Sequence, residues 1–226
     1  MALAMAFAVT SCQSEEELPQ QPTDPQTNRP MVTTGTAKAK IGESEVDVNW
    51  VQLWAGGPKF AEYNVGAASA TEYGGYYTWG GTDKNGENIA WSDDHNTTNT
   101  GSGDLTNTED TATKLWGSKW RMPTQAELQA LLGNCDVVWT TVGGVSGRKF
   151  TGKGAYSSNS VFLPAAGYCI YGDVYDLGDY GSYWSSTPYD SDIAYDLFFG
   201  SRLQDVYYDD RGYGYSVRAV LNESAE

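Results

Sequence analysis

The chain has 226 residues, with 14 basic side chains, 29 acidic side chains and a formal net charge of −15. This length is sufficient for a sizeable hydrophobic core, and the charge argues against nucleic acid as a partner, because such binding depends on Lys and Arg neutralising phosphates. The single His95 excludes multi-histidine metal sites, while 26 Gly, 16 Tyr and 8 Trp favour a loop-rich, aromatic-rich domain that contains β-structure.

The N-terminal residues have the character of an export signal. Residues 1–11 form an apolar run that is too short to span a membrane, since a spanning helix needs about 20 apolar residues. No Lys or Arg precedes the run, so we expect the signal to be truncated at its start. The run ends in Val9-Thr10-Ser11-Cys12, which resembles a bacterial lipobox, in which the Cys thiol receives a diacylglycerol. The alternative is an ordinary tail that contains one Cys.

Residues 12–36 are predicted to be a flexible tether. They are rich in Glu, Gln, Pro and Thr, so they bury too little apolar area to offset the entropy lost on ordering. The acidic residues just after Cys12 fit a surface-exposed outer-membrane lipoprotein or a solvated linker. Residues 37–222 are predicted to be one domain, because no Pro- or Ser-rich break interrupts them. Within it, Cys135 and Cys169 could form a disulfide in an exported protein or remain two buried thiols.

Two short helices are predicted in this domain. The first begins at the N-cap Asp110 and ends before Gly117. The second begins with Thr124 and Glu127 in a capping box, and Gly133 is expected to end it. The apolar stripes that would face the core are Ala112, Leu115 and Trp116 in the first helix and Leu128, Leu131 and Leu132 in the second.

Short strands and turns are predicted for the remainder. Alternation of apolar and polar residues predicts strands at Val46–Trp54 and Ala194–Phe199. Paired glycines such as Gly143-Gly144 mark turns. Residues 82–108 are rich in Asn, Thr, Gly and Asp, which predicts a long surface loop.

Five sequence motifs, the first in two parts, occur in order between residues 46 and 221. They are Lys59–Ala67 with Tyr73–Gly80, Trp120–Leu128, Phe162–Tyr168, Gly181–Ser186 and Ser216–Val220. Together they resemble the Fibrobacter succinogenes major paralogous domain, and the second motif is also similar to a segment of formylglycine-generating enzymes. The resemblance implies an α+β, C-type lectin-like fold of the formylglycine-generating-enzyme variety, with two helices and a small twisted antiparallel sheet carrying long loops. It also implies a cell-surface lipoprotein, and some such proteins are variable proteins of diversity-generating retroelements.

Motifs for catalysis or metal binding are absent from the sequence. It contains no GxSxG, HExxH or CxxC and no phosphate-binding glycine loop. Formylglycine-generating enzymes depend on cysteines late in the domain, and no Cys follows Cys169. Asp209 and Asp210 could supply oxygen ligands, but Ca²⁺ needs six to eight that converge. We therefore expect no enzyme activity, no cofactor and no metal site.

The region from Gly154 to Asn222 has the composition of a binding surface. Its 69 residues include 12 of the 16 Tyr and nine Asp, but no Lys, Glu or Met and only one Gln and one Trp. Tyr with small polar residues is typical of antibody binding loops, because Tyr provides rigid amphipathic contact at low entropic cost. Randomised adenines in Asn codons never encode Lys, Glu, Gln, Met or Trp, so the depletion also fits retroelement diversification. Close packing of Gly and Tyr in β-loops is the alternative explanation.

Two criteria separate scaffold residues from contact residues: membership of the five motifs, and the side of the strand to which a residue points. Residues within the motifs, such as Trp184 and Arg218, are expected to be scaffold. In the strand at residues 194–199, Ala194, Leu197 and Phe199 are expected to point inward, and Tyr195, Asp196 and Phe198 outward.

The predicted binding face combines the outward residues with polar and aromatic neighbours. It consists of Tyr189, Asp190, Asp192, Ile193, Asp196, Phe198, Arg202, Leu203, Tyr207, Tyr208, Asp209, Asp210 and Tyr213. The expected function is a surface lipoprotein that binds an unknown protein or glycan ligand through this face and contacts the membrane only through lipid on Cys12. The alternatives are a non-diversified surface or carbohydrate-associated module and an enzyme of the formylglycine-generating type.

Overall fold

The computed structural model describes residues 23, 32–82 and 102–224. Cys12, His95 and most of the predicted loop at residues 82–108 lie outside the described residues. Strand accounts for 46% and helix for 11% of the described residues. The predicted α+β, C-type lectin-like fold with one small sheet is therefore wrong, and the fold is mostly β with four antiparallel sheets. The short strands that we predicted for one small sheet are instead distributed over several antiparallel hairpins and sheets.

The largest sheet joins the two ends of the domain. Its strands are β1 (Thr34–Ile41), β2 (Ser44–Gln52), β3 (Lys59–Ala61), β4 (Trp120–Arg121) and β13 (Val220–Leu221). They lie in the order β1-β2-β3-β13-β4. β2 corresponds to the strand predicted at residues 46–54, and β1 begins within the segment that composition assigned to the tether.

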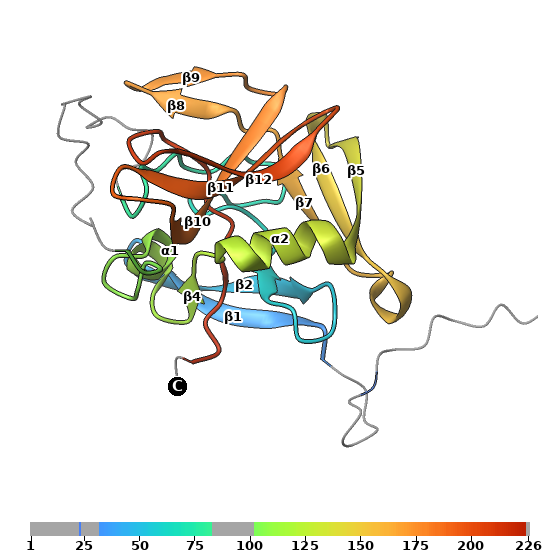
Figure 1. The fold of residues 1–226 in the computed structure, drawn as a ribbon. Helices are drawn as coiled ribbons and strands as arrows, with labels where there is room; N and C mark the ends of the chain where they lie inside the picture. The colour runs from blue at the N-terminus through green and yellow to red at the C-terminus, as the bar shows by residue number, and fades with distance from the viewer. Residues whose placement is uncertain (1–22, 24–31, 83–101, 225–226) are drawn as a thin grey trace, which may run out of the picture.

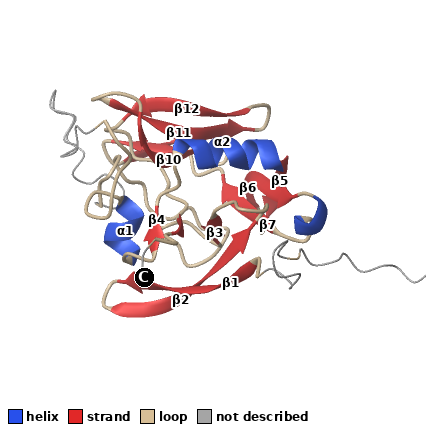
Figure 2. Ribbon diagram, turned by 60° about the horizontal axis from the view of Figure 1, so that its bottom comes forward, coloured by secondary structure: helices blue, strands red, loops and turns tan. Residues whose placement is uncertain are grey.

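Three smaller sheets follow in the second half of the chain. The strands are β5 (Cys135–Val142), β6 (Val145–Gly152), β7 (Ser160–Pro164), β8 (Tyr168–Ile170), β9 (Asp173–Tyr175), β10 (Tyr180–Pro188), β11 (Ile193–Gly200) and β12 (Gln204–Asp210), with a 3₁₀ turn, η2 (Gly154–Tyr156), before β7. β5-β6-β7 and β10-β11-β12 each form a three-stranded sheet, and β8 pairs with β9. The β1–β2 hairpin and the β10–β12 sheet lie on opposite sides of the molecule (Figures 1 and 2).

Both predicted helices are present. In α1 (Thr111–Trp116) the Asp110 side chain accepts a hydrogen bond from the Thr113 amide at 2.8 Å. In α2 (Gln125–Asn134) both hydrogen bonds of the capping box between Thr124 and Glu127 are formed. The prediction that Gly133 ends the helix is wrong, because the helix continues to Asn134 and the chain passes directly into β5. None of the described helices is long and apolar enough to cross a membrane.

Two hydrophobic clusters lie on either side of the β10–β12 sheet. The first is built around Trp79, Trp116, Trp120, Trp184 and Tyr215. The second includes Leu128, Leu131, Tyr183, Leu197 and Phe199. Tyr183 and Trp184 are neighbours in β10, so their side chains point to opposite faces of the sheet and enter different clusters. α2 packs along the face that belongs to the second cluster (Figure 2).

Arg218 is fully buried and joins distant parts of the chain, as expected for a scaffold residue. Its guanidinium donates hydrogen bonds to Asn64 Oδ1 at 2.9 Å and to the carbonyl oxygens of Glu62 at 2.8 Å and Phe162 at 2.9 Å. Because these acceptors are neutral, burial lowers the pKa of Arg218 to about 10. Cys135 and Cys169 are both buried and are not joined to each other, so the disulfide alternative is not realised.

Candidate functional site

The register of the β11–β12 hairpin decides which predicted site residues share a face. Asp196 pairs with Tyr207, and Phe198 pairs with Asp205. Directly opposed residues of an antiparallel pair lie on the same side of the sheet, so these four side chains lie on one face. Asp209 belongs to the same face because it lies two residues after Tyr207. The opposite face carries Leu197, Phe199 and their neighbours of the second cluster.

A hollow of about 510 Å³ lies on this face of the hairpin. Its lining consists of Asp196, Phe198, Leu203, Gln204, Asp205, Tyr207 and Asp209. Five of the thirteen predicted site residues are therefore brought together here. Asp205 and Gln204 were not predicted, although the spacing of two from Tyr207 and Asp209 along a strand would have identified Asp205.

Asp196 lies at the floor of the hollow and is only 2% exposed. Its predicted outward position is wrong, because β11 is the central strand and Asp196 is flanked by Trp184 on β10 and Tyr207 on β12. Oδ1 of Asp196 has no hydrogen-bond partner among the described residues. Burial raises the pKa of this carboxyl well above its usual range, and the nearby charge of Asp209 raises it further.

The other two carboxylates of the hollow are oriented by local hydrogen bonds. Asp209 Oδ2 accepts from the Tyr215 hydroxyl at 2.7 Å, and its Oδ1 accepts from the Asp210 amide at 2.9 Å. Tyr215 in turn stacks on Trp184, with ring centroids 4.4 Å apart. Asp205 is exposed, and its Oδ1 accepts from the Val206 amide at 2.8 Å. Asp209 is therefore held rigidly against the first cluster, whereas Asp205 lies at the rim.

Exposed tyrosines extend from the hollow around the edge of the sheet. Tyr189, Tyr207 and Tyr208 are 50%, 60% and 43% exposed. The rings of Tyr189 and Tyr208 stack with centroids 4.3 Å apart, and those of Tyr208 and Tyr207 with centroids 5.6 Å apart. Tyr207 and Tyr208 are neighbours on β12, which is an edge strand of its sheet. We call these three residues the tyrosine strip.

The remaining predicted site residues lie in turns around the hairpin. Asp190 Oδ1 accepts from the amides of Asp192 and Ile193, both at 2.9 Å, and closes the turn between β10 and β11. The buried Arg211 donates to the carbonyl oxygens of Asp190 and Ile193 and lies 4.1 Å from the centre of the Trp79 ring. Asp190 and Arg211 thus have clear structural roles in this turn.

Three more of the predicted residues lie outside the hollow as well. Asp210 Oδ1 accepts from the Gly212 amide at 2.7 Å, Tyr213 is half-buried beside Tyr168, and Arg202 is exposed at the turn between β11 and β12. The single continuous face that we expected is therefore divided between the hollow, the tyrosine strip and the turns.

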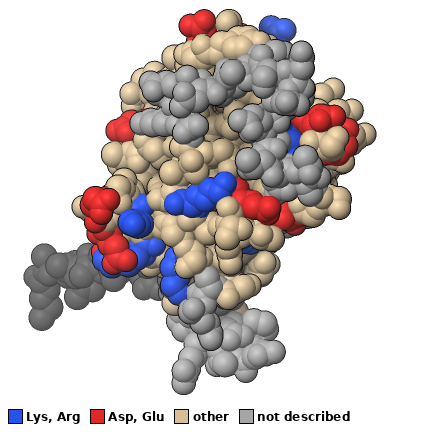
Figure 3. Space-filling model, turned by 90° about the vertical axis from the view of Figure 1, so that its left-hand side faces the viewer, with Lys and Arg blue, Asp and Glu red and all other residues tan. Residues whose placement is uncertain are grey.

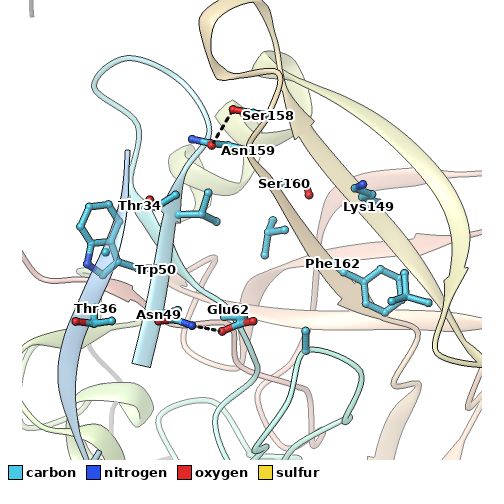
Figure 4. A pocket seen from close by; sticks show the side chains of 15 residues that line it. Thr34, Thr36, Asn49, Trp50, Glu62, Lys149, Ser158, Asn159, Ser160 and Phe162 are labelled. Carbon is cyan, nitrogen blue, oxygen red and sulfur yellow. Dashed lines mark hydrogen bonds between the residues drawn. The ribbon is translucent and has the colours of Figure 1, made fainter. Parts of the chain in front are cut away.

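A second cavity, of about 660 Å³, lies between the β1–β2 hairpin and the β6–β7 pair (Figure 4). Both asparagines of its lining are hydrogen-bonded: Asn49 donates to Glu62 at 2.8 Å, and Asn159 donates to the backbone carbonyl of Gln52 at 2.8 Å. It contains none of the predicted site residues and no unpaired buried group among the described residues. This cavity is therefore the weaker candidate.

The charge of the hollow differs from that of the face drawn in Figure 3. On the face drawn in Figure 3, basic and acidic side chains lie in small mixed groups. The lining of the hollow contains three carboxylates and no Lys or Arg among the described residues. No three His, Cys, Asp or Glu side chains of the described part of the chain converge closely enough to hold a metal ion.

Comparisons with known proteins give one match. A family model described as a domain of unknown function, DUF8237, matches residues 135–220, which include the whole β10–β12 sheet. Searches of curated proteins and of solved structures gave no match to the chain.

Proposed function

We propose that this chain is a ligand-binding protein whose ligand contacts the hollow and the tyrosine strip. The observation that carries the proposal is the strip itself, in which three exposed tyrosine rings stack beside a concave surface. Tyr is enriched at binding hot spots, because a rigid ring buries a large area at small entropic cost while its hydroxyl forms hydrogen bonds. The strip is set on a sheet held from both sides by the core, so it is pre-organised for contact.

The proposal includes a location at the cell surface. The lipobox-like sequence that ends at Cys12 and the tether after it support attachment through a lipid. The residue composition after Gly154 supports diversification of the contact residues by a retroelement. Binding at the hairpin does not depend on either of these two parts, and each has its own test below.

Binding is tested with the double variant Tyr207→Ala/Tyr208→Ala. The matched control is Val138→Ala/Val142→Ala, which removes two exposed apolar side chains from β5. Ligands are recovered with the wild-type chain from a glycan array and from a random-peptide library, and each is then titrated against both variants. We expect the tyrosine variant to bind at least about tenfold more weakly, because one hot-spot residue contributes roughly 2 kcal/mol or more. Equal affinities for the two variants would refute the proposal.

A further inference from the structure

We propose that the hollow binds an organic cation, namely the ammonium or guanidinium group of a Lys or Arg side chain on a partner protein. This inference rests on the proposed function and specifies the chemistry of the ligand. Three features of the hollow support it: the charge of the lining, the unpaired oxygen of Asp196, and the aromatic walls.

The lining is negatively charged and uncompensated. Asp196, Asp205 and Asp209 all face the hollow. None of the three takes part in an ion pair within the described residues. The nearest candidate cation in the sequence, Arg211, is directed to two backbone carbonyls and the Trp79 ring. A cationic ligand would supply the missing positive charge, and complementary charge of this kind determines partner choice and register at interfaces.

Asp196 provides the specific anchoring group. Buried acceptors normally have a hydrogen-bond donor, because an unmatched one bears its full desolvation cost. Oδ1 of Asp196 is buried and lacks such a donor among the described residues. The N–H groups of an ammonium or guanidinium ion can donate to it, and a hydrogen bond between charged partners is stronger than one between neutral partners. A cation at this place would also oppose the burial and the Asp209 charge that raise the pKa of Asp196.

The walls of the hollow fit the rest of a Lys or Arg side chain. Phe198 and Tyr207 lie on the same face as Asp196, and Leu203 closes the end of the hairpin. Aromatic rings attract cations over their faces, and an apolar wall covers the methylene stem that carries the charge. A neutral glycan could also donate to Asp196, but it would leave the negative charge of Asp205 and Asp209 uncompensated. The observations therefore favour the cation.

The test uses three small probes that differ at one group. N-acetyl-lysine methylamide and N-acetyl-arginine methylamide carry the cation, and N-acetyl-norleucine methylamide has a similar stem without it. Each is titrated into the ¹³C,¹⁵N-labelled whole chain while the ring protons of Phe198 and Tyr207 are followed by NMR. We expect saturable shifts with the two cations and at least tenfold weaker binding of the norleucine probe.

Two variants separate a specific anchor from general attraction to an acidic protein. Asp196→Asn is nearly isosteric and should weaken binding of the cations at least tenfold. Asp136→Asn removes the same charge from an exposed position on β5, where the side chain is 72% exposed, and should change binding less than twofold. Tyr207→Ala serves as a second site variant and should also weaken binding. Similar effects of Asp196→Asn and Asp136→Asn, or equal binding of the norleucine probe, would overturn the inference.

The outcomes also distinguish this inference from the proposed function. A ligand from the array that requires Tyr207, carries no cation and is not displaced by N-acetyl-arginine methylamide would overturn the cation inference and leave the proposed function intact. Ligands that bind without any dependence on Tyr207 and Tyr208 would refute the proposed function. Library peptides that compete with the cationic probes should carry a Lys or Arg at one fixed position. Competing peptides without one would contradict the assignment to a partner's side chain.

Discussion

Replacing Asp196 with Asn should stabilise the free protein at neutral pH. The wild-type carboxyl is buried, has one oxygen without a donor and lies near the charge of Asp209. An unsatisfied buried polar group costs about 1–3 kcal/mol, and a charged one costs more. Asn keeps the shape and removes the charge, and its amide can donate toward Asp209. We therefore expect the free energy of unfolding at pH 7 to rise by about 1–3 kcal/mol in the variant.

The raised pKa of Asp196 also determines how the free energy of unfolding changes with pH. Because burial raises the pKa of Asp196, the folded state holds its proton more tightly than the unfolded state does. The contribution of this group to stability is therefore full below its ordinary pKa and is lost as the pH rises toward the raised value. Stability of the wild type relative to Asp196→Asn should accordingly fall between acidic and neutral pH.

Urea unfolding at a series of pH values from 4 to 8 measures both effects. Wild type, Asp196→Asn and the control Asp136→Asn are compared under identical ionic conditions. The control should follow the wild type closely, because Asp136 is exposed. If Asp196→Asn proved less stable than the wild type at pH 7, the carboxylate would have a favourable partner in the free protein. Asp196 would then not be an unpaired anchor that awaits a ligand.

Three further predictions concern the scaffold, the anchor and the gene. Leu131→Ala should lower the free energy of unfolding by roughly 2–5 kcal/mol, because Leu131 is fully buried. Thr124→Ala should lower it by about 1 kcal/mol through loss of the helix cap. An unfolding midpoint for Leu131→Ala equal to that of Val138→Ala would contradict the packing of α2. Metabolic labelling with a fatty-acid analogue should mark the wild type expressed with a full signal sequence, and equal labelling of Cys12→Ala would exclude lipidation at that residue. Sequencing of the flanking DNA should find a reverse-transcriptase gene and a near-copy of the codons for residues 181–220 that differs at adenines; absence of both would exclude diversification.

The parts of the fold that the sequence predicted correctly are those governed by neighbouring residues. The caps at Asp110 and Thr124 are satisfied within three residues, so their side-chain types alone located both helices. The pairing of strands is not local in this way. Gly143 and Gly144 were predicted to form a turn, and both have positive φ, 56° and 87°. The turn alone did not show that eight residues on either side of it would pair as β5 and β6, and the overall fold class was therefore wrong.

The burial of Asp196 also depends on strand pairing that the local sequence does not reveal. Strand alternation places Ala194 and Asp196 on one face and Leu197 and Phe199 on the other, so the prediction that Ala194 points the same way as Leu197 and Phe199 is wrong. The second cluster covers the Leu197 side of β11 and the first cluster covers Ala194 on the other side, so the sequence of apolar residues in this strand does not reveal which side is outside. A polar residue on such a strand is then easily taken for an exposed one. Tyr207 and Tyr208 were placed on the surface correctly, because they lie on the edge strand β12 and both are exposed; their contact with a ligand stays a prediction.

Hydrogen–deuterium exchange of the whole chain tests most directly where a ligand binds. Exchange is followed with and without any ligand recovered from the array or the library, at saturating concentration. We expect protection on binding to be concentrated in the β11–β12 hairpin, residues 193–210, and at Tyr189. Protection confined to the cavity between β1–β2 and β6–β7, with no change in the hairpin, would contradict it.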